Sequence, residues 1–432
     1  MTRIIHGARR RLAKLTHLRS HLWQSLATYT AQGFGMFFGI LLARLLDPTD
    51  YGSFGFAVAV VFLALLPAIW TLAPILVSEG GQTAENHTRA AGFGWCVALA
   101  RLLIVTGLGL YYWNLGKSQT AALCLLIGIG EAGRELNNVQ RCYLEGLGNF
   151  KPNFISALSG VIFCFAVVVP ASQLGWGPFT LVLPGLGGMV IDFFIFRHYS
   201  GRSIFVRPSW WLGSEFMQKS FWLWIYGASE SGLQRVDSWF VGRFQGLVQL
   251  AYYNRAFGYA PLSSLVLSSL VTSPIVVGFN GCKTVLARRR LFFHAALILL
   301  AGGLVNWAAL FFFADPFVHL VFGSKWIGAA PVFKAFAGLS LAYAISQLPT
   351  AVMVAVQGYR QIGVIRFCGL FTFVSVLALL PQLRNPIAIA YLVQVSWVLQ
   401  GVAMLFCARS LLFVSDPPSK LGTQSATSND GF

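Results

Sequence analysis

Long, continuous runs of apolar residues, separated by short turn-rich segments, dominate the chain. A helix that crosses a membrane needs about 20 mostly apolar residues. Because the runs are continuous and do not alternate with polar residues, they predict helices and not the strands of a membrane barrel. Twelve spans are expected, at residues 22–46, 52–77, 91–113, 119–144, 153–171, 178–199, 220–242, 249–279, 291–313, 331–356, 362–382 and 387–413.

The composition supports this all-α, polytopic membrane architecture. Of 432 residues, 56% are hydrophobic and 10% are charged, whereas soluble domains carry about 25% charged residues. A soluble enzyme, a disordered chain and a secreted disulfide scaffold are therefore excluded. The seven cysteines include no C-x-x-C pair, so no metal site is expected. No secretory signal peptide is evident, because the first apolar run is too long.

The basic residues predict how the protein is oriented. The net charge is +17, from 31 basic and 14 acidic residues. If the N-terminus is cytoplasmic, 21 basic residues, counted with Arg141 and Arg366, fall on that side. Five fall on the other side, namely Arg44, Lys117, Arg243, Lys325 and Arg384. Positive charge collects on the cytoplasmic side of membrane proteins. Both termini are therefore expected there, and the charge does not indicate a nucleic-acid partner.

The spans predict two six-helix bundles. The expected division is a basic N-terminal tail at 1–21, bundles at 22–199 and 220–414, a cytoplasmic linker at 200–219, and a disordered cytoplasmic tail at 415–432. No loop outside the membrane exceeds about 20 residues, which leaves no room for a catalytic domain. The G-x-x-x-x-G-K-[ST] and H-E-x-x-H motifs are absent from the sequence. We therefore expect no catalytic residues and a protein that is not an enzyme.

A weak internal repeat supports the two bundles. A constant offset of 199 residues pairs Arg44 with Arg243 and Gly52 with Ala251, at the ends of the first and seventh spans. Both copies begin on the same side of the membrane, so the repeats are parallel. Transporters built from such repeats hold their substrate between the two halves and expose it to each side in turn.

Three segments in register resemble the polysaccharide-biosynthesis flippases of the MATE-like MOP transporter superfamily. Residues 42–54 resemble that family's first span end, with aliphatic-x-Arg, a Pro-containing acidic loop and Tyr-Gly. Residues 235–243 and 251–256 resemble its Arg-x-Asp, Gly-Arg and Gly-x-Tyr-Asn-x-Ala blocks. Residues 322–330 resemble its Phe-Gly-x-x-Trp-x-x-Ala loop. Ala251 stands where the family usually has glycine.

The resemblance implies a V-shaped, MATE-like pair of bundles in the bacterial cytoplasmic (inner) membrane. It implies export of an undecaprenyl-diphosphate-linked glycan for exopolysaccharide or O-antigen synthesis, without naming the sugar. The partners expected on this basis are the lipid bilayer and that lipid-linked substrate, with polymerase or export machinery as a further partner. We expect a monomer.

Charged residues within the predicted spans are candidates for function. A charge near the bilayer centre costs at least about 2.5–3.5 kcal/mol, so it faces a cavity or a partner. Mutual neutralisation in buried pairs is the structural alternative. The basic residues are Arg101, Arg134, Arg235, Arg255 and Lys334, and the acidic ones are Glu131, Glu135, Asp192, Glu230 and Asp237.

Helical spacing groups several of these residues. Glu131, Arg134, Glu135 and Asn138 follow the i, i+3, i+4, i+7 pattern of a single helix face. Glu230, Gln234, Asp237 and Ser238 form a second such stripe in the seventh span, with Arg235 off to its side. Both glutamates fall near the midplane, one in each half, where transporters of this design hold cargo and coupling ions.

These positions predict two roles. Arginine binds phosphate oxygens in a bidentate manner and keeps its charge when buried, whereas burial can neutralise a carboxylate. The predicted substrate-binding residues of a central cavity are Arg101, Arg134, Asn138, Gln234, Arg235, Arg255 and Lys334. The predicted ion-coupling residues are Glu131, Glu135, Glu230 and Asp237. No cofactor is expected, apart from H⁺ or Na⁺ as a coupling ion.

Two other functions remain open from sequence. A MATE-type exporter of cationic drugs would share the fold, but cations favour an acidic cavity, and the predicted spans hold as many basic as acidic residues. A membrane-embedded glycosyltransferase or polymerase would make the polymer instead of moving its unit, but such enzymes usually need a large external loop. The lipid II flippase branch usually has fourteen spans, against the twelve expected here.

Overall fold

The computed structural model describes residues 2–69, 84–209, 213–261 and 284–413, together with a few single positions between 271 and 282. Helix is the regular secondary structure throughout these residues, which confirms the predicted all-α class. The first half contains α1 (Thr2–Leu45), α2 (Pro48–Ala64), the 3₁₀ turn η1 (Leu66–Ala68), α4 (Ala84–Asn114), α5 (Ser118–Gly146), α6 (Lys151–Phe163), the π-helical turn η2 (Cys164–Val168), α7 (Val169–Gln173), η3 (Gly177–Leu181) and α8 (Leu183–Ser200). The second half contains α9 (Gly213–Phe244), α10 (Leu247–Tyr259), α12 (Val285–Phe322), η4 (Ser324–Ala329), α13 (Ala330–Ala335), η5 (Phe336–Gly338), α14 (Leu339–Ala355), α15 (Tyr359–Leu379), η6 (Pro381–Leu383) and α16 (Pro386–Phe413).

Eight helical segments among the described residues are long and apolar enough to cross a membrane, so the chain is a multi-pass membrane protein. They contain α1, α4, α6–α7, α8, α12, α13–α14, α15 and α16. Helices α2, α5, α9 and α10 do not pass the same test, although sequence analysis predicts a span at each. In space, α2 packs against α5, α9 and α10. Helices α2 and α10 are too short to pass the test, and with α9 they lie where the two halves of the chain meet.

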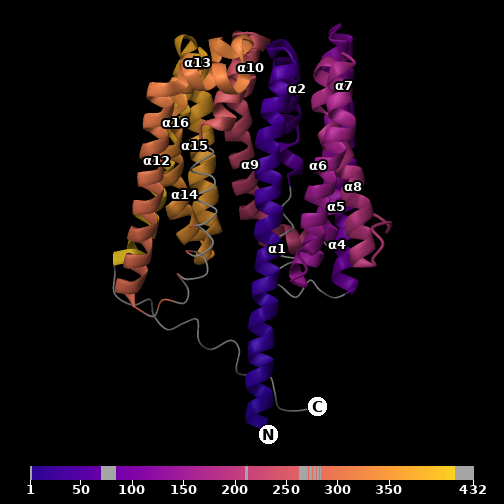
Figure 1. Ribbon diagram of the computed structural model, residues 1–432, viewed down its shortest axis with the longest axis vertical. Helices are drawn as coiled ribbons and strands as arrows, with labels where there is room; N and C mark the ends of the chain where they lie inside the picture. The colour runs from indigo at the N-terminus through magenta and orange to yellow at the C-terminus, as the bar shows by residue number, and fades with distance from the viewer. Residues whose placement is uncertain are drawn as a thin grey trace.

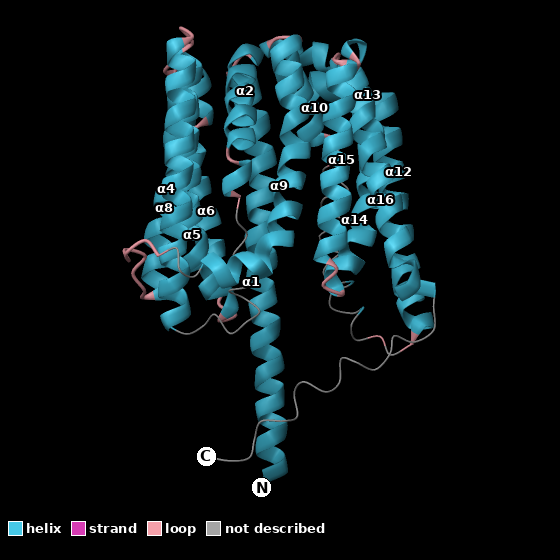
Figure 2. Ribbon diagram, turned by 180° about the vertical axis from the view of Figure 1, so that it is seen from behind, coloured by secondary structure: helices cyan, strands magenta, loops and turns pink. Residues whose placement is uncertain are grey.

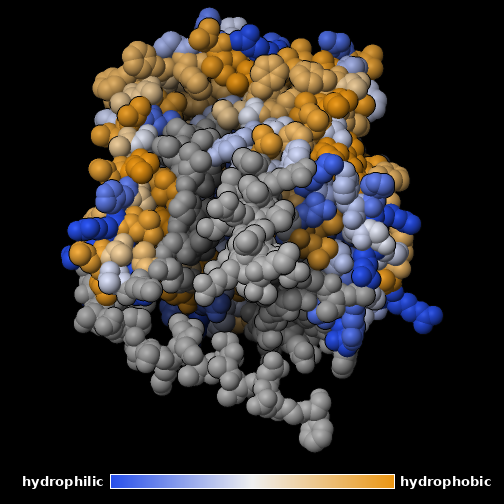
Figure 3. Space-filling view, turned by 60° about the horizontal axis from the view of Figure 1, so that its bottom comes forward, coloured by the Kyte–Doolittle hydropathy of each residue, from blue (hydrophilic) through white to orange (hydrophobic). Residues whose placement is uncertain are grey.

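The helices form two groups that stand side by side (Figures 1 and 2). One group contains α4, α5, α6 and α8, and the other contains α12 to α16. The start of α1 and the end of α16 lie at the same end of the molecule, which we call the N-terminal face; the other end is the opposite face. Seen from the N-terminal face, hydrophobic side chains cover the wall at the top of the view, and hydrophilic ones gather on the lower flanks (Figure 3).

The predicted repeat is visible where α2 meets α10. A side chain on Gly52 would overlap the backbone carbonyl of Leu247, and one on Gly55 would overlap the side-chain amide of Asn254. Gly55 and Asn254 are separated by the repeat offset of 199 residues. Equivalent positions of the two halves therefore face each other, as a two-fold relation between the bundles requires. Glycine lets the two backbones approach this closely.

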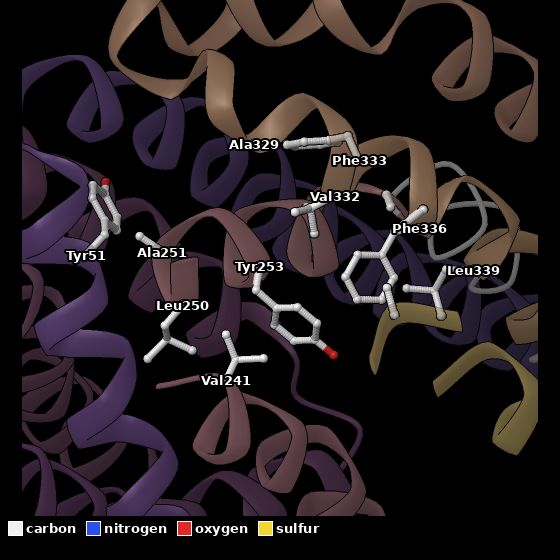
Figure 4. Close-up of a cluster of buried hydrophobic side chains, with 14 of the residues drawn as sticks. Tyr51, Val241, Leu250, Ala251, Tyr253, Ala329, Val332, Phe333, Phe336 and Leu339 are labelled. Carbon is white, nitrogen blue, oxygen red and sulfur yellow. The ribbon is translucent and has the colours of Figure 1, made fainter. Parts of the chain in front are cut away.

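The largest buried cluster lies at the opposite face and contains residues of both halves. Tyr51 of α2 lies in the same cluster as Tyr253 of α10 and Phe336 of η5 (Figure 4). The fully buried Trp326 donates its indole N–H to the Ala43 carbonyl of α1 at 2.8 Å. The halves are thus packed together at this end.

Polar contacts reinforce the joint at the opposite face. The Arg44 guanidinium of α1 donates to the carbonyls of Leu320 and Val321, which end α12. Lys325 pairs with Asp47 at 2.7 Å. Arginine at a helix C-terminus also interacts favourably with the helix dipole. These contacts place Arg44 and Lys325 at the end predicted for them.

Several boundaries differ from the expectation. Helix α1 already begins at Thr2, within the predicted tail, and α9 begins at Gly213, within the predicted linker. Helix α12 is 38 residues long, with a non-helical residue at Phe313 and a proline at 316. Parts of the second and eighth predicted spans, and the predicted disordered tail, lie outside the described residues.

Candidate functional site

One face of α5 borders a cavity of about 510 Å³ in the first half. All four members of the predicted stripe, Glu131, Arg134, Glu135 and Asn138, line it. The remaining lining residues come from α5 itself, from α2 and the turn η1 with the residues that flank them, from α4 and α8, and, in the second half, from α9. They are Phe62, Leu65, Ile69, Arg101, Asn137, Arg141, Asp192, Phe196 and Ser231. The spacing of the stripe is what brings its members together, since residues three and four apart share one face of a helix.

A buried ion pair forms the back wall of this cavity. Arg101 of α4 contacts Glu135 at 2.9 Å, and both side chains are less than a tenth exposed. The same guanidinium donates to the carbonyls of Ala68 and Glu131, both at 3.1 Å. Arg101 is thus held by three partners, an arrangement that ties α4, α5 and η1 together. The geometry fits a structural pair better than a free cargo or ion site.

The second pair on the stripe is open to the cavity. Arg134 contacts Glu131 at 2.9 Å, and its side chain is 52% exposed. Such half-exposed pairs contribute at most about 1 kcal/mol. The Arg134 guanidinium can therefore exchange this carboxylate for another anion at little cost.

An adjoining cavity of about 340 Å³ joins the two halves. Phe62, Glu131 and Arg134 line both cavities, and Arg235 of α9 enters the second one from the other half. The Arg235 guanidinium lies over the Phe62 ring, 5.1 Å from its centroid. Among the described residues, no carboxylate lies within 4 Å of the Arg235 guanidinium. Arg235 and Arg134 thus present two guanidinium groups to one space.

Two more charged residues line the cavity: Arg141, which was missed as a candidate from sequence, and Asp192, which was named as a candidate but given no role. Arg141 was counted as a cytoplasmic loop residue, but it lies on α5, three residues beyond Asn138, whose side-chain oxygen it contacts at 2.8 Å. Arg141 continues the stripe, and its spacing of three residues from Asn138 is the sequence feature that could have identified it. Asp192 of α8 accepts a hydrogen bond from Ser156 of α6. With Arg235, the joined cavities carry four arginines and three carboxylates.

The second predicted stripe faces away from the cavities. Glu230 contacts Arg366 of α15 at 3.1 Å, and Gln234 donates to Glu230 at 3.3 Å. Arg366 is fully buried, donates to Gln400 at 2.9 Å and lies 4.5 Å from the centre of the Trp397 ring. The placement of Arg366 in a cytoplasmic loop is therefore wrong, because it lies two turns inside α15.

Asp237 is completely buried between α9 and α10. It accepts hydrogen bonds from the Tyr253 hydroxyl at 2.7 Å and from the Ser238 backbone N–H at 2.5 Å. Ser238 in turn donates to Asn254 at 2.8 Å. These partners hold α9 to α10, and neither described cavity reaches this carboxylate.

Two predicted cavity residues lie elsewhere. Lys334 pairs with Asp315 of α12 at 2.5 Å near the opposite face. Arg255 lies 3.7 Å from the centre of the Tyr51 ring, a cation–π contact between α10 and α2. Neither residue lines the two cavities that contain the stripe, so their role as substrate-binding residues stays a prediction. The sequence identified both as charged residues within helices, but it did not reveal their partners, Asp315 and Tyr51.

Nothing in the described part of the chain gathers three or more His, Cys, Asp or Glu side chains in a way that could hold a metal ion. The described cysteines are unpaired. The chemistry available in the cavities is consequently that of guanidinium, carboxylate and amide groups. That set binds and orients an anion.

Known structures share this fold. A multidrug-resistance MATE family transporter in an inward-facing conformation has a TM-score of 0.66 at 12% identity, with 91% of this chain and 98% of that chain covered. The lipid II flippase MurJ, in an inward closed conformation, has a TM-score of 0.66 at 15% identity, covering 90% and 87%. MATE in a bent conformation has a TM-score of 0.55 at 12% identity, with 92% of this chain and 91% of that chain covered. At these identities the likeness concerns the fold, and it confirms the MATE-like arrangement.

No curated protein matches the sequence. The model of one protein family, described as "Polysaccharide biosynthesis protein", does match, over residues 41–331. That stretch runs from the end of α1 to the start of α13 and includes both cavities. The chain is therefore a membrane-embedded member of the polysaccharide biosynthesis protein family, built on the MATE-like fold.

Proposed function

We propose that this protein is a flippase for a polyprenyl-diphosphate-linked oligosaccharide used in polysaccharide synthesis. The observation that carries the proposal is the pair of guanidinium groups, Arg134 from the first half and Arg235 from the second, in one cavity. Guanidinium binds phosphate oxygens in a bidentate manner. A diphosphate between these two arginines would contact both halves of the transporter at once.

The joint between the halves supports an assignment of the state in which the transporter stands. Their described hydrogen bonds and ion pairs cluster at the opposite face, as shown by Arg44, Trp326 and Lys325. We assign the N-terminal face to the cytoplasm, in keeping with the positive-inside rule, and the membrane to the bacterial inner membrane. In this state cargo would enter from the cytoplasm, and release outside would require the opposite-face contacts to break.

Glu131 supplies a way to couple cargo to an ion. Its carboxylate is paired with Arg134 and borders both cavities. A diphosphate that binds Arg134 displaces Glu131, and the freed carboxylate can then take up a proton or Na⁺. Glu135, Glu230 and Asp237 already have protein partners. Glu131 is therefore the coupling residue we propose.

A cation exporter is the less suitable alternative. The joined cavities carry four arginines against three carboxylates, and one of those carboxylates is sealed against Arg101. A cationic drug would meet net repulsion in this space, whereas a diphosphate would meet attraction.

The test is transport in vesicles. Purified protein is reconstituted with a fluorescent polyprenyl-diphosphate saccharide, and the loss of fluorescence to a membrane-impermeant quencher reports flipping. Arg235→Gln should abolish flipping, while Lys117→Gln, at the exposed start of α5, should leave it intact as the matched control. Unchanged flipping in Arg235→Gln would refute the diphosphate site.

A second arm separates a flippase from an enzyme. In a strain that lacks the protein, a flippase defect leaves complete lipid-linked repeat units on the cytoplasmic side. If the units are never assembled, the protein makes the polymer instead of moving its unit, and the transport proposal fails.

A further inference from the structure

Helix α5 has an apolar face as well as a polar one, and it packs along α8 (Figure 2). On the apolar side, α5, η3 and α8 border a pocket of about 360 Å³. Its lining is entirely apolar: Leu126, Trp176, Phe179, Val182, Leu183 and Leu186. Trp176 is half exposed, and Ile129 of α5 and Val190 of α8 are exposed on the same side. In a membrane this surface contacts lipid tails.

Only side chains separate this pocket from the arginines. Leu126, Val182 and Leu186 line the apolar pocket and also the 340 Å³ cavity that contains Arg134 and Arg235. A single layer of aliphatic groups thus forms the partition between the lipid-facing pocket and the charged cavity.

Two glycines of α5 face α8 beside this partition, and Gly133 is the one where a side chain would be crowded. A Cβ on Gly130 would lie 3.6 Å from Leu186, and one on Gly133 would overlap the Met189 side chain. The hydrogen bond from Asn137 to the Met189 carbonyl, at 2.7 Å, lies further toward the N-terminal face. Van der Waals contacts therefore hold the part of the seam next to the pocket, and they can separate and re-form without leaving a polar group unpaired.

Arg134 lies at the seam itself. A Cβ on Gly185 of α8 would be 3.6 Å from its terminal guanidinium nitrogen. The Arg134 guanidinium therefore lies beside the α8 backbone at Gly185. The positive group and the apolar pocket adjoin each other across Leu186 and its two neighbours in the partition.

We propose that the α5–α8 seam is the lateral portal for the cargo lipid. The isoprenoid chain occupies the apolar pocket between α5, η3 and α8, while its diphosphate binds Arg134 inside. This inference rests on the proposed function and adds the place where the tail lies. A ligand with an anionic end and a long apolar chain matches the arrangement, because transferring the chain into water would cost about 0.8 kcal/mol per CH₂. The portal lets the tail remain in the bilayer while the head group crosses.

The test is photocrosslinking from a single residue. A benzophenone amino acid replaces Leu183, which lines the outer pocket but not the charged cavity. The matched control carries it at Leu103, a lipid-exposed position on α4. Both proteins are placed in phosphatidylethanolamine–phosphatidylglycerol vesicles that contain a radiolabelled long-chain polyprenyl diphosphate. Capture of the probe at position 183 should exceed capture at position 103 by about tenfold, and Arg134→Ala should remove the excess.

The outcomes separate the two proposals. Binding of the probe is measured independently, by its stoichiometry on the purified protein. If the probe binds but is captured equally at both positions, or if phospholipid is captured at position 183 instead, the portal is wrong and the flippase proposal stands. If the probe does not bind at all, both are wrong. A folding defect in the Leu183 variant is bypassed by repeating the capture from Trp176, on the same pocket.

Discussion

The polar stripes on α5, in the first half, and on α9, in the second, use their charged residues in different ways. In the first half, Arg134 and Glu131 face a cavity and remain accessible. In the second, Glu230 and Arg366 are packed inside the helix bundle, where the guanidinium has no exposed surface. Both halves contain an acidic residue at the expected depth, and the repeat relates the bundles. Two similar polar stripes can therefore serve differently, one lining a cavity and the other supplying a structural ion pair.

The reason lies in what packs against each stripe. The face of α5 that carries Glu131 meets the cavity lined by α2, α4 and α8. The corresponding face of α9 meets α10 and α15, which supply Tyr253 and Arg366 as partners. Charge that is sealed by neighbouring helices supports the fold, whereas charge at a cavity is available for ligands.

The largest effect is expected on the sealed pair. Arg366→Met leaves Glu230 without its cation, and breaking a buried ion pair costs about 3–5 kcal/mol. Thermal unfolding of the purified protein in detergent should show a much lower midpoint and a lower yield of folded protein. The double variant Arg366→Met with Glu230→Gln should recover most of the loss. A single variant as stable as the parent would show that the second half does not depend on this pair.

Arg101 tests whether a charged residue becomes structural because it is buried or because of the half in which it lies. It lies in the first half but is sealed against Glu135. Arg101→Met is therefore expected to behave like Arg366→Met, with a loss of about 3 kcal/mol in the free energy of unfolding. The measurement is again the unfolding midpoint, with Arg101→Met plus Glu135→Gln as the rescue. If Arg101→Met instead leaves the midpoint unchanged and weakens cargo binding, Arg101 is a ligand group.

Arg134 should show the reverse pattern. Removal of a charge-assisted hydrogen bond to phosphate costs about 1.5–3 kcal/mol, which corresponds to about 10- to 150-fold weaker binding. Arg134→Gln should thus raise the Kd for polyprenyl diphosphate by this factor, with the unfolding midpoint unchanged, because the side chain is 52% exposed. Binding is followed by native mass spectrometry. A large fall in the unfolding midpoint of Arg134→Gln would show that Arg134, like Arg366, stabilises the fold.

The smallest effect is expected at Glu131. Its pair with Arg134 is worth at most about 1 kcal/mol, so Glu131→Gln should bind polyprenyl diphosphate no more than about fivefold more tightly. Flipping should nonetheless slow, because no carboxylate at position 131 can pair again with Arg134 and so help to release the cargo. The vesicle assay measures both quantities on one preparation. Normal flipping with unchanged affinity would remove Glu131 as the coupling residue.

The sequence by itself determined the class, the spans and one polar face. Long apolar runs require a membrane, because nothing else buries them, and helices satisfy their own backbone hydrogen bonds there. The 3.6-residue period of a helix placed Glu131, Arg134, Glu135 and Asn138 on one face, and all four line one cavity. Asp237 and Ser238, of the second stripe, both form hydrogen bonds to α10, at Tyr253 and Asn254.

The tertiary structure decided where each face points. The period says which residues share a face of α9, but the packing of α9 between α2, α10 and α15 turned Arg235 toward the cavity and Glu230 away from it. Arg366 sits near a helix start in the sequence, and only its neighbours show that it is buried. Contacts between segments hundreds of residues apart have no period along the chain, so local spacing could not reveal them.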